Sequence, residues 1–167
     1  MPTVRLSFSP APAHVRTARL VGVAVARRAG VAEELLEEIR LAIGEACSRA
    51  VALHRSNGVE DLVDVALDDG DRFTVRVVDH AGNGSGLVEA ADDPELLFAD
   101  QSDDPTVDLA LSIPSGGDAI SEEAVAARMG LALLAGLVDD LEVAIVAGGL
   151  GTEVSMSWPV QRKAPDV

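Results

Sequence analysis

Aromatic rings, cysteine and basic residues are all scarce in this sequence, and each shortage excludes a class of site. With three Phe, one Trp and no Tyr, the chain has too few rings for an aromatic platform that binds single-stranded nucleic acid. Cys47 is the only cysteine, which excludes a disulfide framework and a cysteine-rich zinc site, so we expect a small buried hydrophobe there. The net charge of -15 disfavours direct nucleic-acid binding, which needs clustered Lys and Arg, and favours a basic protein partner.

Long apolar runs are missing as well. No segment approaches the roughly 20 apolar residues that span a bilayer, and no basic stretch precedes an apolar run near the N-terminus. We therefore expect no membrane association and a cytoplasmic location. A length of 167 residues and a hydrophobic content of 48% are sufficient for one domain with its own core. We assign this domain to residues 1–160, followed by a flexible tail at 161–167.

What the sequence does contain is a succession of strand and helix patterns. Strands are predicted where apolar and polar residues alternate, and helices where apolar residues recur every three or four positions. Gly30 is predicted to end the first helix. The predicted elements, in chain order, are a strand at 3–8, helices at 13–28 and 32–54, a hairpin of strands at 62–67 and 73–78, a helix from 121 to about 138, and strands at 141–147 and 154–158.

A long acidic segment interrupts this succession. Between Gly84 and Ala127 the chain has eleven Asp or Glu, three Pro and no Lys or Arg, which predicts a mobile acidic loop over about 84–125. The loop could screen a cleft, attract a basic partner, or simply be a solvated surface. The order of the remaining elements predicts an α+β fold in which helices cover one face of a mixed, mostly antiparallel sheet.

The segment LAIGEACSRAV, residues 41–51, resembles the N-box helix of the RsbW/SpoIIAB-type anti-sigma factors, a branch of the GHKL or histidine kinase-like ATPases. The resemblance implies a Bergerat-type two-layer sandwich, with ATP and Mg²⁺ as possible cofactors. In that family a Glu supports phosphoryl transfer, and an Asn four residues later contributes to the metal and phosphate site. Glu45 matches the Glu, but Arg49 replaces the Asn. A guanidinium only donates and cannot coordinate Mg²⁺, so Arg49 would contact phosphate directly, pair with Glu45 or have another structural role.

A second similarity follows the predicted hairpin. The sequence DHAGNG resembles the family's Asp-x-Gly-x-Gly loop, which implies that Asp79 accepts a hydrogen bond from the adenine amino group. It also implies that Gly82 and Gly84 let the backbone approach the nucleotide. Ala81 takes the place of the first Gly, or one residue is inserted. Asp79 is equally explained by a turn with the glycines that follow, and His80 is interpreted as a solvated loop residue.

Two further segments complete the resemblance. The sequence RMGL is similar to the Gly-x-Gly-Leu motif that opens a helix beneath the phosphates, which implies that Arg128 and Gly130 lie near an anion. Arg128 stands where the first Gly would be. The sequence GTEVSMSW resembles the family's last strand, where a Thr lies near the nucleotide. Thr152 matches that Thr, and it is also explained as an ordinary strand residue. No metal ligand is predicted.

The resemblance also implies partners. The family binds a sigma factor and a STAS-type anti-anti-sigma protein, which it phosphorylates on Ser or Thr with ATP, and a homodimer is possible. Arg16 matches the partner-contacting Arg by position and Arg19 is its neighbour, although Arg16 is also explained as an exposed helix charge. Because Arg49, Ala81 and Arg128 replace family residues, we predict an anti-sigma factor with weak or absent kinase activity. The alternatives are an active Ser/Thr kinase and a small-ligand sensor.

Overall fold

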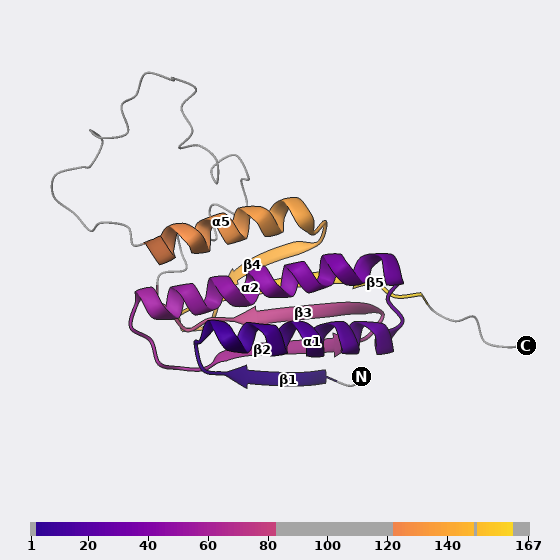
Figure 1. The fold of residues 1–167 in the computed structure, drawn as a ribbon, viewed down its shortest axis with the longest axis horizontal. Helices are drawn as coiled ribbons and strands as arrows, with labels where there is room; N and C mark the ends of the chain where they lie inside the picture. The colour runs from indigo at the N-terminus through magenta and orange to yellow at the C-terminus, as the bar shows by residue number, and fades with distance from the viewer. Residues whose placement is uncertain (1–2, 83–121, 149, 162–167) are drawn as a thin grey trace, which may run out of the picture.

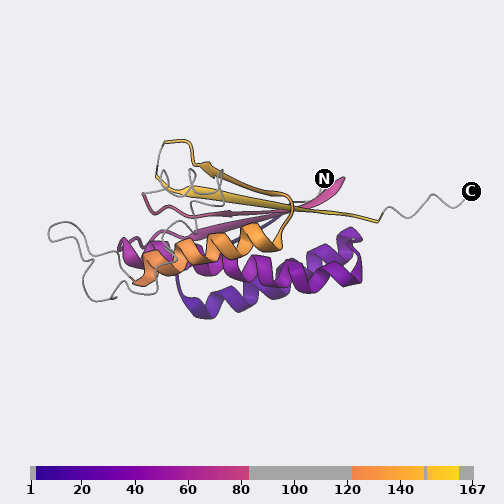
Figure 2. The same ribbon diagram turned by 90° about the horizontal axis from the view of Figure 1, so that it is seen from above.

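The computed structural model describes residues 3–82, 122–148 and 150–161, and these form two layers (Figures 1 and 2). A β-sheet makes one layer, and the helices pack together on one of its faces. This is the α+β architecture predicted from the order of elements. Gly84 and most of the predicted acidic loop lie outside the described residues, as do residues 162–167 of the predicted tail.

The described sheet has five strands in the order β1-β2-β3-β5-β4. They are β1 (Thr3–Phe8), β2 (Val63–Asp69), β3 (Arg72–Val78), β4 (Leu141–Ile145) and β5 (Thr152–Pro159). Each neighbouring pair is antiparallel, so the described sheet is wholly antiparallel, whereas the sequence predicted a mixed one. Strands β2 and β3 form the predicted hairpin.

Three α-helices cover this sheet in the described part of the chain. They are α1 (Pro12–Ala29), α2 (Leu36–Ser56) and α5 (Glu122–Leu137), and a 3-10 turn, η1 (Glu33–Leu35), precedes α2. Helix α2 lies between α1 and α5 (Figure 1). Helix α5 begins at Glu122, as predicted from the cap at 121, so the predicted loop over about 84–125 was too long at its end, where residues 122–125 are helical. No helix in the described ranges has the length and apolar character needed to cross a membrane.

The apolar core lies between the sheet and the helices. Alternate residues of β2, β3 and β5 are buried, while those between them are partly exposed, as the alternation in the sequence predicts. The buried stripe of α2 recurs every three or four residues and comprises Ile39, Ala42, Ile43, Ala46 and Ala50, all 0% exposed. Burial, opposed by the charge of Arg19, raises the pKa of the Cys47 thiol to about 12. Cys47 is therefore an unreactive buried hydrophobe, as predicted.

Gly30 ends α1, as predicted. Its φ of 88° is left-handed, and its N–H donates to the carbonyl groups of Ala26 and Arg27, which satisfies part of the helix terminus. The chain then turns directly into η1 and α2, which brings the second helix alongside the first.

Candidate functional site

The candidate nucleotide site contains a buried ion pair between α2 and the end of β3. Arg49 lies on α2, and Asp79 is the first residue after β3. Arg49 Nη1 donates to Asp79 Oδ2 at 3.1 Å, and both side chains are 0% exposed. Of the alternatives that the sequence left open, Arg49 therefore has a structural pairing, and its partner is Asp79 and not Glu45.

The guanidinium of Arg49 is only partly satisfied. Its Nε and Nη2 atoms are buried and have no hydrogen-bond partner among the residues that the structure describes. Burial lowers the pKa of Arg49 and outweighs the raising effect of the Asp79 charge and hydrogen bond. A guanidinium that is 0% exposed depends on its carboxylate partner, because bulk solvent does not reach the charge.

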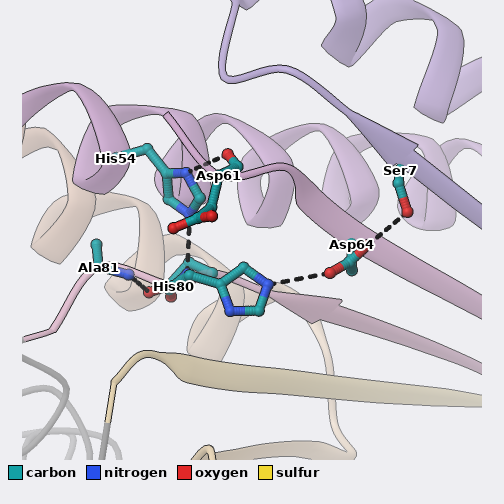
Figure 3. A network of polar contacts seen from close by, with 7 residues as sticks. Ser7, His54, Asp61, Asp64, His80 and Ala81 are labelled. Carbon is teal, nitrogen blue, oxygen red and sulfur yellow. Dashed lines mark hydrogen bonds and ion pairs between the residues drawn. The ribbon is translucent and has the colours of Figure 1, made fainter. Parts of the chain in front are cut away.

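Three consecutive backbone amides hold the turn that follows β3. The N–H of Asp79 donates to the carbonyl oxygen of Thr152 at 3.0 Å. The N–H of His80 donates to Nε2 of His54 at 2.8 Å, and the N–H of Ala81 donates to Oδ1 of Asp79 at 3.1 Å (Figure 3). The turn is thus bonded to β5, to α2 and to its own first side chain.

Both carboxylate oxygens of Asp79 are used within the chain. Oδ2 accepts from Arg49, and Oδ1 accepts from the N–H of Ala81. Asp79 therefore takes part in a turn, which was the alternative explanation for this residue in the sequence. Each oxygen keeps a second lone pair, but the side chain is 0% exposed, so an adenine amino group could reach it only if the groups that cover it moved. In this arrangement Asp79 is paired and covered, and it is not accessible to a nucleotide in the way that the resemblance implies.

His80 is not the solvated loop residue that the sequence predicted. It is partly buried, and its Nε2 lies 3.0 Å from Oδ2 of Asp64 on β2. The other oxygen of Asp64, Oδ1, accepts from the hydroxyl of Ser7 on β1 (Figure 3). Burial raises the pKa of Asp64, but the hydrogen bonds with Ser7 and His80, together with the charges of His80 and His54, outweigh burial, so that the pKa is lowered. His80 therefore connects the end of β3 to two neighbouring strands.

His54 is a residue that sequence analysis missed. It lies in the last turn of α2 and is 0% exposed. Its Nδ1 lies 3.0 Å from the carbonyl oxygen of Asp61, and its Nε2 accepts from His80. A signal was present, because His54 follows Ala50 by four residues and so continues the buried stripe of α2.

Gly151 lets β5 approach the turn closely. Its φ is +117°, and a Cβ at this position would lie 1.9 Å from the carbonyl oxygen of Asp79 and 2.8 Å from its carbonyl carbon. Only a residue without a side chain fits against this backbone. Gly151 therefore helps to place Asp79 opposite Arg49.

Gly151→Ala is expected to lower the free energy of unfolding by about 2–4 kcal/mol, because the added methyl group meets backbone atoms and not a flexible side chain. Gly148→Ala is a matched control. Its φ is +103°, but a Cβ there meets nothing within 4 Å, so a loss of only about 1–2 kcal/mol is expected. Urea denaturation followed by the fluorescence of Trp158, the only tryptophan, measures both losses. Equal losses would contradict the close approach.

Helix α5 packs over the part of α2 that carries the ion pair. A Cβ at Gly130 would lie 3.7 Å from Cβ of Arg49 and 3.7 Å from Oε2 of Glu45, which is partly buried. Thr152 begins β5, is buried, and has an Oγ1 atom with no partner among the described residues. The fold thus gathers Glu45, Arg49, Asp79, Gly130 and Thr152 into one region between α2, α5 and β5.

The segment Arg128–Gly130 does not form the helix start that the resemblance implies. Since α5 begins at Glu122, these residues lie inside the helix, where backbone amides bond to carbonyl groups four residues earlier. Arg128 is exposed. No free amides are available there to hold an anion. Gly82 is exposed just beyond the turn.

The two arginines predicted to contact a partner lie on α1, which is separated from α5 by α2 (Figure 1). Arg16 is exposed. Arg19 is partly buried against α2, where a Cβ at Gly44 would lie 2.3 Å from its Nε atom. Arg16 is therefore accessible to a partner, and Arg19 packs between the two helices.

Within the described ranges, no group of three or more His, Cys, Asp or Glu side chains is arranged to hold a metal ion. Comparison with protein families supports the resemblance at the level of the domain. The family model of the histidine kinase-like ATPase domain matches residues 8–158, a range that includes all of the candidate site residues. No curated protein matches the sequence.

Proposed function

Because this chain belongs to the histidine kinase-like ATPase domain family, we propose that it is an anti-sigma regulatory protein with weak or absent kinase activity. It binds a sigma factor and is relieved by a STAS-type anti-anti-sigma partner. The anti-sigma assignment is supported by the N-box-like sequence around Glu45 and by the position of Arg16. Sequestration of a sigma factor requires a binding surface and no phosphate transfer.

The observation that carries the noncatalytic part is the buried pair of Arg49 and Asp79. Arg49 has no oxygen atom to offer Mg²⁺, and both oxygens of Asp79 already accept hydrogen bonds. Because the ion pair is 0% exposed, a nucleotide could reach Asp79 only if the residues packed around the pair moved, and moving Arg49 away would leave a buried charge unpaired. Glu45 matches by position the Glu that supports phosphoryl transfer in the resembling family. Without a nucleotide bound beside it, Glu45 has no phosphate to transfer.

The position of Arg16 supports the binding part. Helix α1 contains no acidic residue, and its last two arginines pair elsewhere, Arg27 with Glu33 and Arg28 with Asp69. The exposed guanidinium of Arg16 can form two parallel hydrogen bonds with a carboxylate of a partner, which gives orientation as well as attraction.

Affinity capture from the native cell, with and without MgATP and followed by mass spectrometry, tests the proposal. A sigma factor is expected in both samples at similar yield, and the purified protein is expected to transfer no labelled phosphate from ATP to the captured antagonist. Rapid transfer would overturn the noncatalytic part and favour an active Ser/Thr kinase. Recovery of neither a sigma factor nor a small antagonist would overturn the anti-sigma assignment and leave only the domain family.

Arg16→Ala is expected to weaken binding of the captured sigma factor by on the order of tenfold or more, because truncating an interface arginine commonly removes more than 1 kcal/mol. Arg55→Ala is the matched control, since Arg55 is also exposed but lies at the end of α2, and its binding should equal that of the wild type. Isothermal calorimetry at one salt concentration measures the three affinities. Equal affinities for all three proteins would remove Arg16 from the interface.

A further inference from the structure

The ring of His54 is held by one acceptor and one donor, which permits a single protonation state. Its Nδ1 faces the carbonyl oxygen of Asp61 at 3.0 Å, so this nitrogen carries hydrogen and donates. Its Nε2 accepts from the N–H of His80 at 2.8 Å, so this nitrogen carries none. Only the neutral imidazole with hydrogen on Nδ1 satisfies both contacts. Figure 3 shows the ring placed between the two partners.

The groups around His54 favour the neutral ring on balance. Burial lowers its pKa most strongly, and the charge of His80 lowers it further. The hydrogen bond to Asp61 and the charges of Asp79 and Asp61 raise it, but the pKa remains below the ordinary value of 6.5. Asp64 lies beyond His80, where its carboxylate contacts the ring of His80 and the hydroxyl of Ser7.

We propose that the contact between His54 and His80 is a pH-sensitive link, in which uptake of a solvent proton by Nε2 of His54 breaks the bond to His80 and loosens the turn that carries Asp79. A proton on Nε2 would turn this nitrogen into a donor that faces another donor, the N–H of His80. A buried donor left without an acceptor is unfavourable, so the two groups separate.

The contact between His54 and His80 lies in the turn that carries Asp79, so a change in this contact affects the candidate site. The N–H of His80 is the middle one of the three amides that hold the turn, between those of Asp79 and Ala81. Ala81 packs in a small apolar cluster with Leu53 of α2 and Leu131 of α5. Release of His80 therefore weakens the connection between α2 and the turn that carries Asp79 and Ala81.

The direction of the pH effect follows from the neutral ring. Since the folded state lowers the pKa of His54, the folded state binds fewer protons than the unfolded chain below about pH 6.5. The stabilisation is complete above that pH and declines as the pH falls towards the lowered value. This effect is independent of the proposed anti-sigma function.

Nuclear magnetic resonance of the full chain tests the link, because the sequence has only three histidines, at positions 14, 54 and 80. At neutral pH, ¹⁵N spectra of the rings are expected to show hydrogen on Nδ1 of His54. Between neutral pH and about pH 5.5, the protection of the His80 amide, corrected for its intrinsic exchange rate, is expected to fall by on the order of tenfold. Hydrogen on Nε2 of His54 at neutral pH, or protection that does not change with pH, would overturn the proposal.

Variants separate the link from other effects of acid. In His54→Gln the side-chain oxygen can still accept from His80 but does not titrate, so the pH dependence of protection should disappear. His14→Gln is the matched control, since His14 is exposed, and the pH dependence should remain. His80→Asn removes the contact with Asp64 but keeps the backbone N–H, so the dependence should also remain. An unchanged dependence in His54→Gln would overturn the proposal, and if that variant does not fold, the wild-type spectra decide alone.

Discussion

Asp79→Asn is expected to lower the free energy of unfolding by about 3–5 kcal/mol, because it leaves the guanidinium of Arg49 buried without its counter-charge. Arg49→Met/Asp79→Asn is expected to recover much of this loss, since the double variant buries no charge and Met fills most of the space of the Arg side chain. The double variant is therefore expected to be more stable than Asp79→Asn alone. Urea denaturation followed by Trp158 fluorescence gives the three free energies, together with that of Arg49→Met.

The pair of Arg27 and Glu33 is a matched control for this cycle. Its Nε–Oε1 distance is also 3.1 Å, but its side chains are 61% and 72% exposed. Glu33→Gln is therefore expected to change stability by less than about 1 kcal/mol. If the effects of Arg49→Met and Asp79→Asn add within about 0.5 kcal/mol, the two groups are not coupled and the argument from the buried pair is wrong.

Arg49→Asn is expected to produce a protein that MgATP stabilises, whereas the wild type does not respond to millimolar nucleotide. The substitution frees Oδ2 of Asp79 and places an amide oxygen where the resembling family has one. Alone, the variant is expected to be less stable than the wild type by about 3–5 kcal/mol, since Asp79 loses its cation. Nucleotide at about 100 times its Kd is expected to restore about 2.7 kcal/mol. Thermal denaturation over a range of MgATP concentrations measures the response.

Two further variants control this experiment. Arg49→Met removes the guanidinium without supplying an oxygen, and Arg49→Asn/Asp79→Asn removes the carboxylate that would accept from adenine. Neither is expected to respond to MgATP. Stabilisation of the wild type equal to that of Arg49→Asn would contradict the proposal that the internal pair excludes nucleotide. An Arg49→Asn protein that folds and does not respond would show that the pair is not what prevents binding.

The sequence determined the fold in outline, because the spacing of apolar residues and the residue types that form turns are local properties of the chain. Alternation predicted β2 and β3 within a few residues, and the apolar stripe of α2 predicted the helix that carries Glu45 and Arg49. The ordered motifs led to the domain family that the comparison supports. The start of α5 was also predicted, near residue 121, but the acidic composition continues through its first residues and extended the predicted loop to about 125.

Only the tertiary structure decided which carboxylate neutralises the charge of Arg49 in the candidate site. From the sequence, Glu45 was the nearest carboxylate to Arg49 on the same helix, whereas the actual partner, Asp79, is 30 residues away. The same holds for His54, which meets a backbone N–H 26 residues later. Such contacts depend on how α2 is rotated on the sheet and on how closely Gly151 lets β5 approach. A local pattern specifies which residues are buried on a helix, but the partner of a buried charge is set by the packing of distant segments.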